Sequence, residues 1–232
     1  MLQVFQTRFF VRGLFIFSLI ITTVSVASCK FKSDEKLQSK NTGIDSIIKT
    51  EPFNPSPDTS FELIDRTDGY FDSSIAITYT DQKGKKWIAP EGTITDGASI
   101  PTLFEKFFGG RLNKDFLLAA IIHDAYCALA NEKGSSYQIE SWQNTHHMFY
   151  NACIDNGTDK TTAATMYAAV RLGGPRWSLN EKSVTSLQET LSDSILIKEM
   201  EKCNYWIQSK GDTLTLDDVD KWMDEREKIL LN

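Results

Sequence analysis

The stretch LLAAIIHDAYCALA, residues 117–130, constrains the fold of this 232-residue chain more than any other feature. It is almost continuously apolar, as expected for a helix that is buried all round. His123 and Asp124 nonetheless stand side by side in its middle. Burying a polar group without a partner costs roughly 2–7 kcal/mol. We therefore expect both side chains to meet specific partners inside the protein.

Helix signals extend from this stretch in both directions. Asn113 is placed to cap a helix over residues 114–131, which stops near Gly134. A second long helix is predicted over residues 138–155, and a third from Thr158 to the GGP sequence at 173–175. A short loop between the first two would make them antiparallel neighbours.

The segment before these helices has strand and loop patterns. Residues 73–80, SSIAITYT, alternate polar and apolar side chains, and DQKGKK and WIAP follow, so a β-hairpin ending near Pro90 is predicted. The sequence then runs into the loop TDGASIP, in which Ser99 could cap a short helix. The expected fold class is α+β, mainly α, with a short N-terminal β-hairpin or sheet followed by several helices.

The C-terminal part is expected to be helical. Residues 183–209 fit a helix, and residues 215–231 form an amphipathic final helix in which Thr215 and Asp218 have the spacing of a capping box.

The N-terminus has the layout of a secretory signal peptide. Arg8 and Arg12 precede an apolar run, and small residues lead to Cys29. VASC, residues 26–29, resembles the lipobox of bacterial lipoproteins, which implies cleavage before Cys29 and acylation of its thiol. An ordinary signal peptide or an uncleaved anchor is the alternative. We therefore assign residues 1–28 to a signal peptide, residues 29–60 to a lipidated cysteine and flexible tether, and residues 61–232 to one globular domain.

The net charge of the chain and its predicted lipid anchor restrict the classes of binding partner that we expect. The formal net charge is −6 and becomes −8 when Arg8 and Arg12 are removed with the signal. An acidic chain is a poor nucleic-acid ligand, because phosphate neutralisation by Lys and Arg dominates that affinity. The expected partner is the membrane, through the lipid on Cys29. Lys30 after the cysteine resembles the outer-membrane sorting pattern, so a bacterial outer-membrane lipoprotein is expected, facing the periplasm or the cell surface.

Titratable residues gather on the two long helices. All three histidines, His123, His146 and His147, fall within 25 residues. His123 lies eight residues before the end of its helix, and His146 lies eight after the start of the next, so the two can face each other. Asp124 points about 100° away from His123 on the helix. It can therefore face the TDGAS loop.

Three interpretations of these residues stay open. Asp124, His146 and Asp96 could hold one divalent cation that activates water. Alternatively His123 could be a general base, oriented by His146, while Asp124 binds the cation. In both, Asp96, Gly97 and Ser99 form a ligand-binding loop, since glycine permits a tight backbone there. The third interpretation is structural: the His-Asp pair only fastens the loop.

The motifs TDGASIP, AAIIHDAY, HHMF and MYAAVRLGG resemble the family of bacterial and phage proteins known as domain of unknown function 1353. The resemblance covers about residues 60–177 and leaves 178–232 as a C-terminal helical extension. It implies a domain but no activity. In the family's usual Ala-Asp-x-x-Phe pattern, this chain has His146 at the aspartate position and Phe149 at the phenylalanine.

A fainter resemblance is to secreted phospholipases of the A-two type, which carry His-Asp-x-x-Tyr on one helix. It implies that His123 activates water and Asp124 holds calcium. The double-glycine calcium loop is missing, and His146 replaces the orienting aspartate. The two function classes are therefore a cation-assisted envelope hydrolase and a non-catalytic envelope or phage-related module.

The remaining cysteines give a geometric expectation. With opposed histidines on antiparallel helices, Cys127 and Cys153 are about 16 Å out of register. A disulfide needs Cα atoms within about 7 Å, so no bridge between them is expected. A Cys153–Cys203 bridge is possible.

Overall fold

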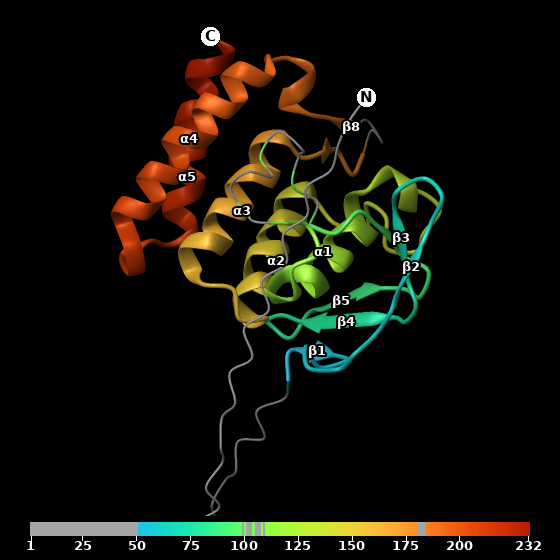
Figure 1. The fold of residues 1–232 in the computed structure, drawn as a ribbon. Coiled ribbons are helices and arrows are strands. Elements are labelled where there is room, and N and C mark those ends of the chain that lie inside the picture. Colours follow the sequence, from blue (N-terminus) through green and yellow to red (C-terminus); the bar gives the residue numbers. More distant parts are fainter. Residues whose placement is uncertain (1–50, 99, 101–103, 105–107, 109, 181–183) are drawn as a thin grey trace, which may run out of the picture. The chain divides into compact units, whose positions relative to one another are not determined.

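The apolar stretch forms helix α1, Lys114–Cys127, at the centre of the computed structural model (Figure 1). The structure describes residues 51–98, 100, 104, 108, 110–180 and 184–232. Asn113 caps α1 as predicted, accepting a hydrogen bond from the Asp115 amide. Every residue from Leu118 to Cys127 is buried. The two polar residues of the stretch therefore lie in the core.

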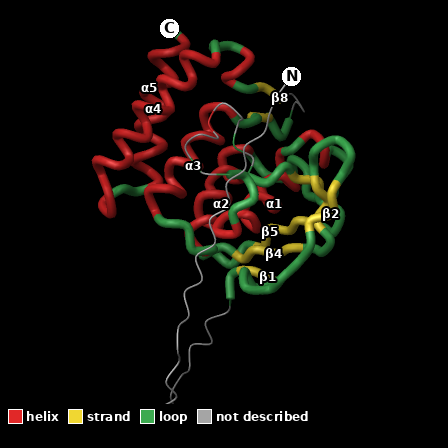
Figure 2. Tube along the Cα trace, in the orientation of Figure 1, coloured by secondary structure: helices red, strands yellow, loops and turns green. Residues whose placement is uncertain are grey.

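Strands cover one side of α1 and helices the other (Figure 2). In the first antiparallel sheet the order is β1-β4-β5, and the second pairs β3 with both β2 and β6. The hairpin β4–β5 confirms the predicted one, and its alternating pattern turns Ile77, Tyr79, Trp87 and Ala89 inward. The strands are β1 (Phe53–Asn54), β2 (Leu63–Asp65), β3 (Phe71–Ser73), β4 (Ile77–Thr80), β5 (Lys86–Ala89), β6 (Ile94–Thr95), β7 (Arg176–Trp177) and β8 (Val184–Thr185).

Helices α1 and α2 are antiparallel. The Asn156 side chain, just beyond the end of α2, donates to the Lys114 carbonyl at the start of α1, while His123 and His146 meet near the opposite ends. The remaining helices are α2 (Trp142–Asp155), α3 (Lys160–Gly173), α4 (Asp193–Lys210) and α5 (Leu216–Leu231). The mainly α form of α+β is confirmed.

Two predicted helix ends differ from the structure. Helix α1 stops at Cys127, and a short 3-10 turn, Leu129–Asn131, follows. Helix α2 begins at Trp142, because Ser141 caps it and Gln138 takes a φ of 52° to donate its amide to the Tyr126 carbonyl. That turn, rather than a helix, joins α1 to α2.

The domain begins before the predicted boundary at residue 61. Phe53 in β1 is only 2% exposed, pairs with Tyr79 of β4 and packs against its ring. Residues 53–54 of the predicted tether are therefore part of the sheet. The predicted signal peptide, Cys29 and the tether up to residue 50 lie outside the described residues.

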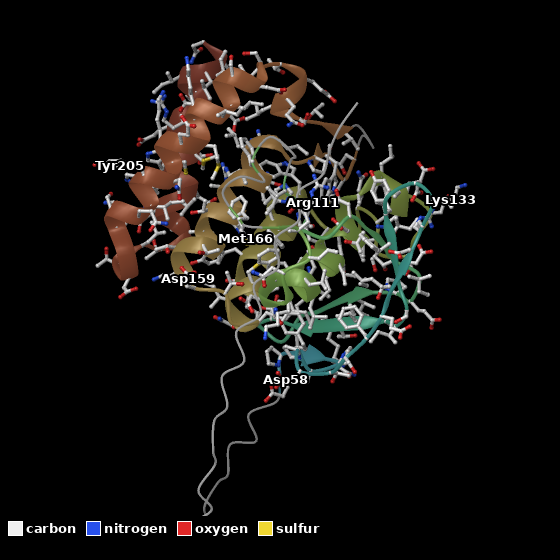
Figure 3. The ribbon with its side chains drawn as sticks, in the orientation of Figure 1. Asp58, Arg111, Lys133, Asp159, Met166 and Tyr205 are labelled. Carbon is white, nitrogen blue, oxygen red and sulfur yellow. The ribbon has the colours of Figure 1, made fainter. Side chains whose placement is uncertain are left out.

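The C-terminal helices pack on α3. Met166 of α3 is fully buried between the helices, whereas Tyr205 of α4 projects outward (Figure 3). The predicted capping box of Thr215 and Asp218 is present at the start of α5. Residues 184–192 lack the predicted helix, since they contain β8 and a 3-10 turn.

Two further expectations concern cysteines and membranes. Cys127, Cys153 and Cys203 are all free thiols, so the possible Cys153–Cys203 bridge is not formed. Among the described residues, no helix combines the length and apolar character needed to span a bilayer.

Candidate functional site

A histidine pair joins α1 to α2 inside the core. His123 Nε2 and His146 Nδ1 lie 2.9 Å apart, and both side chains are fully buried. The His123 ring also packs against Phe149, with ring centroids 4.9 Å apart. The opposition of His123 and His146, expected from their equal spacing from the loop, is therefore present.

Burial disfavours the charged form of both imidazoles. Burial lowers the pKa of His123 to about 3. Burial, followed by the repulsion that two protonated rings would exert on each other, also lowers the pKa of His146 well below its ordinary value. A neutral imidazole has one N–H donor and one acceptor nitrogen. The contact is therefore an N–H···N hydrogen bond, and the proton on one ring decides which nitrogen of the other is free.

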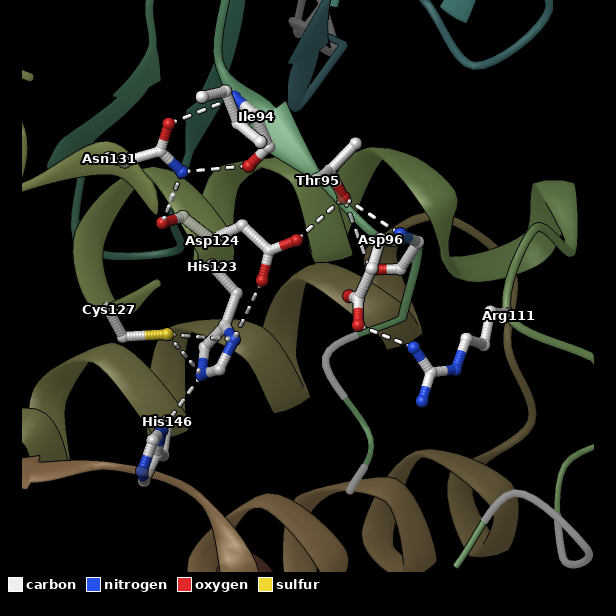
Figure 4. A network of polar contacts seen from close by, with 10 residues as sticks. Ile94, Thr95, Asp96, Arg111, His123, Asp124, Cys127, Asn131 and His146 are labelled. Carbon is white, nitrogen blue, oxygen red and sulfur yellow. Dashed lines mark hydrogen bonds and ion pairs between the residues drawn. The ribbon is translucent and has the colours of Figure 1, made fainter. Parts of the chain in front are cut away.

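Asp124 uses only one of its two carboxylate oxygens in hydrogen bonding (Figure 4). Its Oδ2 accepts a 2.6 Å hydrogen bond from the Thr95 hydroxyl of β6. Its Oδ1 is buried without a hydrogen-bond partner and lies 4.0 Å from His123 Nδ1. Burial, and then the nearby Asp96 charge, raise the pKa of Asp124 well above the usual carboxyl range. The site thus disfavours an uncompensated anion.

Cys127 forms a compact cluster with His123 and Asp124. It lies one helical turn beyond His123, and its Sγ is 3.4 Å from His123 Nδ1. Single ligand atoms from His123, Asp124 and Cys127 all lie within 4.8 Å of one another. Sequence reasoning missed Cys127 as a site residue. Its i, i+4 spacing from His123 was the available signal, because residues four apart share a helix face.

The TDGAS loop lies against this cluster. Gly97 has a φ of 93°, and its amide donates to the Thr95 hydroxyl. The next amide, of Ala98, donates to the Arg111 carbonyl at 2.7 Å. Asp96 forms a 2.5 Å ion pair with Arg111. The predicted loop residues Asp96 and Gly97 therefore lie beside the cluster, and Ser99 falls outside the described residues.

An open pocket of about 700 Å³ lies next to the cluster. Asp124 and Cys127 contribute to its lining, while His123 and His146 lie behind them. Asp96 and Arg111 also line the pocket, as do residues 173–175. A ligand in this pocket would reach the Asp124 carboxyl and the Cys127 thiol before the two imidazoles.

The cluster differs from the ligand set expected from the sequence. That set joined Asp124 and Asp96 to His146, but in the structure His146 contacts His123. The group of potential ligand atoms found in the described part of the chain is His123, Asp124 and Cys127. Through that contact the His146 ring stands outside the compact His123, Asp124 and Cys127 group.

The fold and site together define an α+β domain with a buried His-Asp-Cys cluster beneath a pocket. The chain matches the model of the family described as "Protein of unknown function (DUF1353)" over residues 74–170. It is 30% identical over 168 residues to uncharacterized protein y4iH of Sinorhizobium fredii, which covers 63% of this chain and 67% of that protein. The chain belongs to the DUF1353 family.

A second relative, uncharacterized protein y4jT of the same organism, is 36% identical over 118 residues. That match covers 51% of this chain and 33% of y4jT, so the chain spans only a third of that longer protein. No solved structure matches the chain. The family match contains every residue of the cluster, whereas β1, α4 and α5 lie outside it.

Proposed function

We propose that this domain is a divalent-cation-assisted hydrolase whose reaction takes place at the His-Asp site. The observation that carries the proposal is the position of the cluster: three side chains with metal-binding atoms converge beneath a pocket wide enough for a small substrate. A buried polar site of this kind at the base of a concavity is the usual place for chemistry.

Each group has a role that follows from its contacts. A divalent cation at Asp124 would compensate the negative charge of the buried carboxylate. It would also make a bound water a nucleophile at neutral pH. His123 stands beside it, held by His146 through the 2.9 Å hydrogen bond. Asp96 and Arg111 in the pocket wall present both signs of charge to a substrate.

The test combines metal analysis, hydrolysis and thermal unfolding. Purified domain is assayed for bound metal and for hydrolysis of ester, phosphodiester and amide probes, with and without a chelator. Asp124→Asn should abolish both bound metal and hydrolysis, because the anionic oxygen is lost. Asp115→Asn, an exposed carboxyl on the same helix, is the matched control. Wild-type unfolding that ignores the chelator, with no metal or activity lost in Asp124→Asn, would refute the proposal.

The second candidate is a non-catalytic module, and one observation favours it. The Thr95 hydroxyl of β6 donates to the Asp124 carboxyl of α1. The Asn131 amide donates both to the Ile94 carbonyl of β6 and to the Asp124 carbonyl, so these bonds join β6 to α1. Under this hypothesis the Asp124→Asn protein keeps its function, because an amide still accepts from Thr95. The hypothesis gives no role to Asp124 Oδ1, which points away from that fastening and has no hydrogen bond.

We further propose that the protein is a lipoprotein of the bacterial outer membrane, anchored through Cys29. The support is the arrangement of Arg8 and Arg12, an apolar run and the VASC sequence. Cys29→Ala should leave an uncleaved precursor or release a soluble form, whereas Cys127→Ala should not alter processing. Mass spectrometry that finds cleavage elsewhere and no lipid on Cys29 would contradict this proposal.

A further inference from the structure

We infer that Cys127 is a metal ligand and that the site binds a thiolate-accepting ion of the zinc type through His123 Nδ1, Asp124 Oδ1 and Cys127 Sγ. This inference deepens the proposed hydrolase function. Its test, however, measures metal binding and needs no substrate.

The spacing along α1 brings the three ligands together. Residues three and four apart lie on the same helix face, so Cys127 can reach both Asp124 and His123. Zinc bonds of about 2.0–2.3 Å with tetrahedral angles place ligand atoms about 3.3–3.7 Å apart. The Nδ1–Sγ distance is already 3.4 Å, and the Nδ1–Oδ1 distance is 4.0 Å. All three ligand atoms lie within 4.8 Å of one another, so side-chain adjustments of about 1 Å would close the triangle.

Asp124 Oδ1 is the independent sign that a ligand belongs here. The side chain is 2% exposed, and its Oδ1 faces the cluster without a hydrogen bond. A buried carboxylate oxygen without a partner costs free energy that a native site normally recovers. The Thr95 hydroxyl holds Oδ2 of the carboxyl through a hydrogen bond. The other oxygen, Oδ1, is thereby directed towards His123 and Cys127.

The contact with His146 accommodates the form of His123 that can bind a metal. When His123 Nε2 carries the proton and donates to His146 Nδ1, the lone pair of His123 lies on Nδ1, facing the cluster. Metal-bound histidines generally donate their other N–H to such an outer partner, which sets their orientation and basicity. His146 is therefore a positioning residue and lies outside the ligand set.

The donor atoms decide which ion fits. Calcium and magnesium bind almost entirely through oxygen, whereas thiolate and imidazole favour zinc and related transition ions. Three protein ligands leave one tetrahedral position, as in catalytic zinc sites. Because Asp124 and Cys127 line the pocket, that position would face the space where a substrate enters.

The experiment uses zinc and cobalt(II) with the full-length protein and four variants. Cobalt(II) bound to thiolate gives a near-ultraviolet charge-transfer band, which reports the sulfur ligand directly. We expect one ion per chain and the band in the wild type. Cys127→Ser should lose the band and weaken zinc binding more than about 100-fold, since loss of an outer partner alone costs about 10–100-fold. His146→Ala should weaken binding within that smaller range while keeping the band.

Two variants separate ligation from folding. Cys153→Ser changes a fully buried thiol of α2 outside the cluster and should keep both the band and the zinc affinity. Cys127→Asp keeps an anionic ligand at the site and should bind zinc without the band. This rescue shows that the Cys127→Ser defect comes from the lost ligand, and circular dichroism verifies that each variant is folded.

The outcomes distinguish this inference from the proposed function. Zinc binding through Cys127 with no hydrolysis of any probe would leave the site assigned and overturn the hydrolase. Hydrolysis that depends on calcium, with no cobalt–thiolate band, would overturn the zinc assignment and leave the hydrolase. Unchanged zinc affinity in Cys127→Ser, or a covalent substrate adduct on Cys127 in metal-free protein, would also overturn it.

Discussion

Replacing Gly97 by alanine tests how tightly the TDGAS loop is built against the site. Gly97 has a φ of 93°, a region that residues with a Cβ rarely adopt. An added Cβ would lie 2.5 Å from the Arg111 carbonyl oxygen, and the neighbouring atom is backbone that cannot simply rotate away. The substitution therefore strains the loop and also forces it away from Arg111.

The backbone strain and the displacement of the loop contribute separately to the loss of folding free energy in Gly97→Ala. A left-handed alanine costs about 1–2 kcal/mol. Relieving the close contact requires a shift of about 0.9 Å to reach ordinary van der Waals separation, and the 2.7 Å hydrogen bond from Ala98 to the Arg111 carbonyl then breaks. Its loss costs about 0.5–1.5 kcal/mol. The total is about 1.5–3.5 kcal/mol, which lowers the melting temperature of a domain of this size by about 3–14 °C.

Gly92→Ala is the matched control, because Gly92 has a φ of 77° and open space around its added Cβ. Gly92→Ala should lose only the free energy that a left-handed alanine costs, about 1–2 kcal/mol. Urea unfolding of both variants measures the difference, and only Gly97→Ala should also weaken metal binding, since the Gly97 amide donates to the Thr95 hydroxyl that holds Asp124. Equal destabilisation by the two variants would show that the close approach to Arg111 is unimportant.

Two further predictions concern the supports around the site. Asn131→Ala removes three hydrogen bonds that join β6 to the end of α1; it should cost about 2–4 kcal/mol in urea unfolding, against less than about 0.5 for the exposed Asn144→Ala. At Glu199, burial favours a raised pKa, but hydrogen bonds from Arg226 and Lys202 outweigh it and lower that pKa. Its stabilisation is therefore present above the ordinary pKa of 4.5 and is lost as pH falls through the lower folded value. Glu199→Gln should flatten the decline of melting temperature in that acid range, and an unchanged decline would contradict this assignment.

Elements with local chemical signals could be predicted from the sequence. The Asn113 cap, the β4–β5 hairpin and the Thr215–Asp218 capping box each depend on residues a few positions apart, and the structure contains all three. The same holds for the buried helix α1, whose continuous apolar run leaves no polar face for solvent. Such features are decided by neighbours in the chain, so a single sequence contains the needed information.

Elements that depend on distant partners could not be predicted in this way. Strand β1 has two residues, and only its pairing with β4 and the burial of Phe53 make it part of the domain. A polar, proline-containing segment gives no local sign of that pairing. The start of α2 was likewise set by a remote contact, from the Gln138 amide to the Tyr126 carbonyl, which replaces a first helical turn with a sharp bend.

The site was predicted in part for the same reason. Equal spacing from a loop was enough to oppose His123 and His146, because it depends only on two helices being antiparallel. The third member of the cluster depends on side-chain direction: Cys127 lies on the His123 face of α1, and Asp96 is held by Arg111. His146 accepts or donates one hydrogen bond in its contact with His123, and burial, which lowers its pKa, disfavours a charge on it. A neutral partner leaves the cluster with one carboxyl and one thiol as its potential anions, and two such ligands balance the charge of one divalent ion.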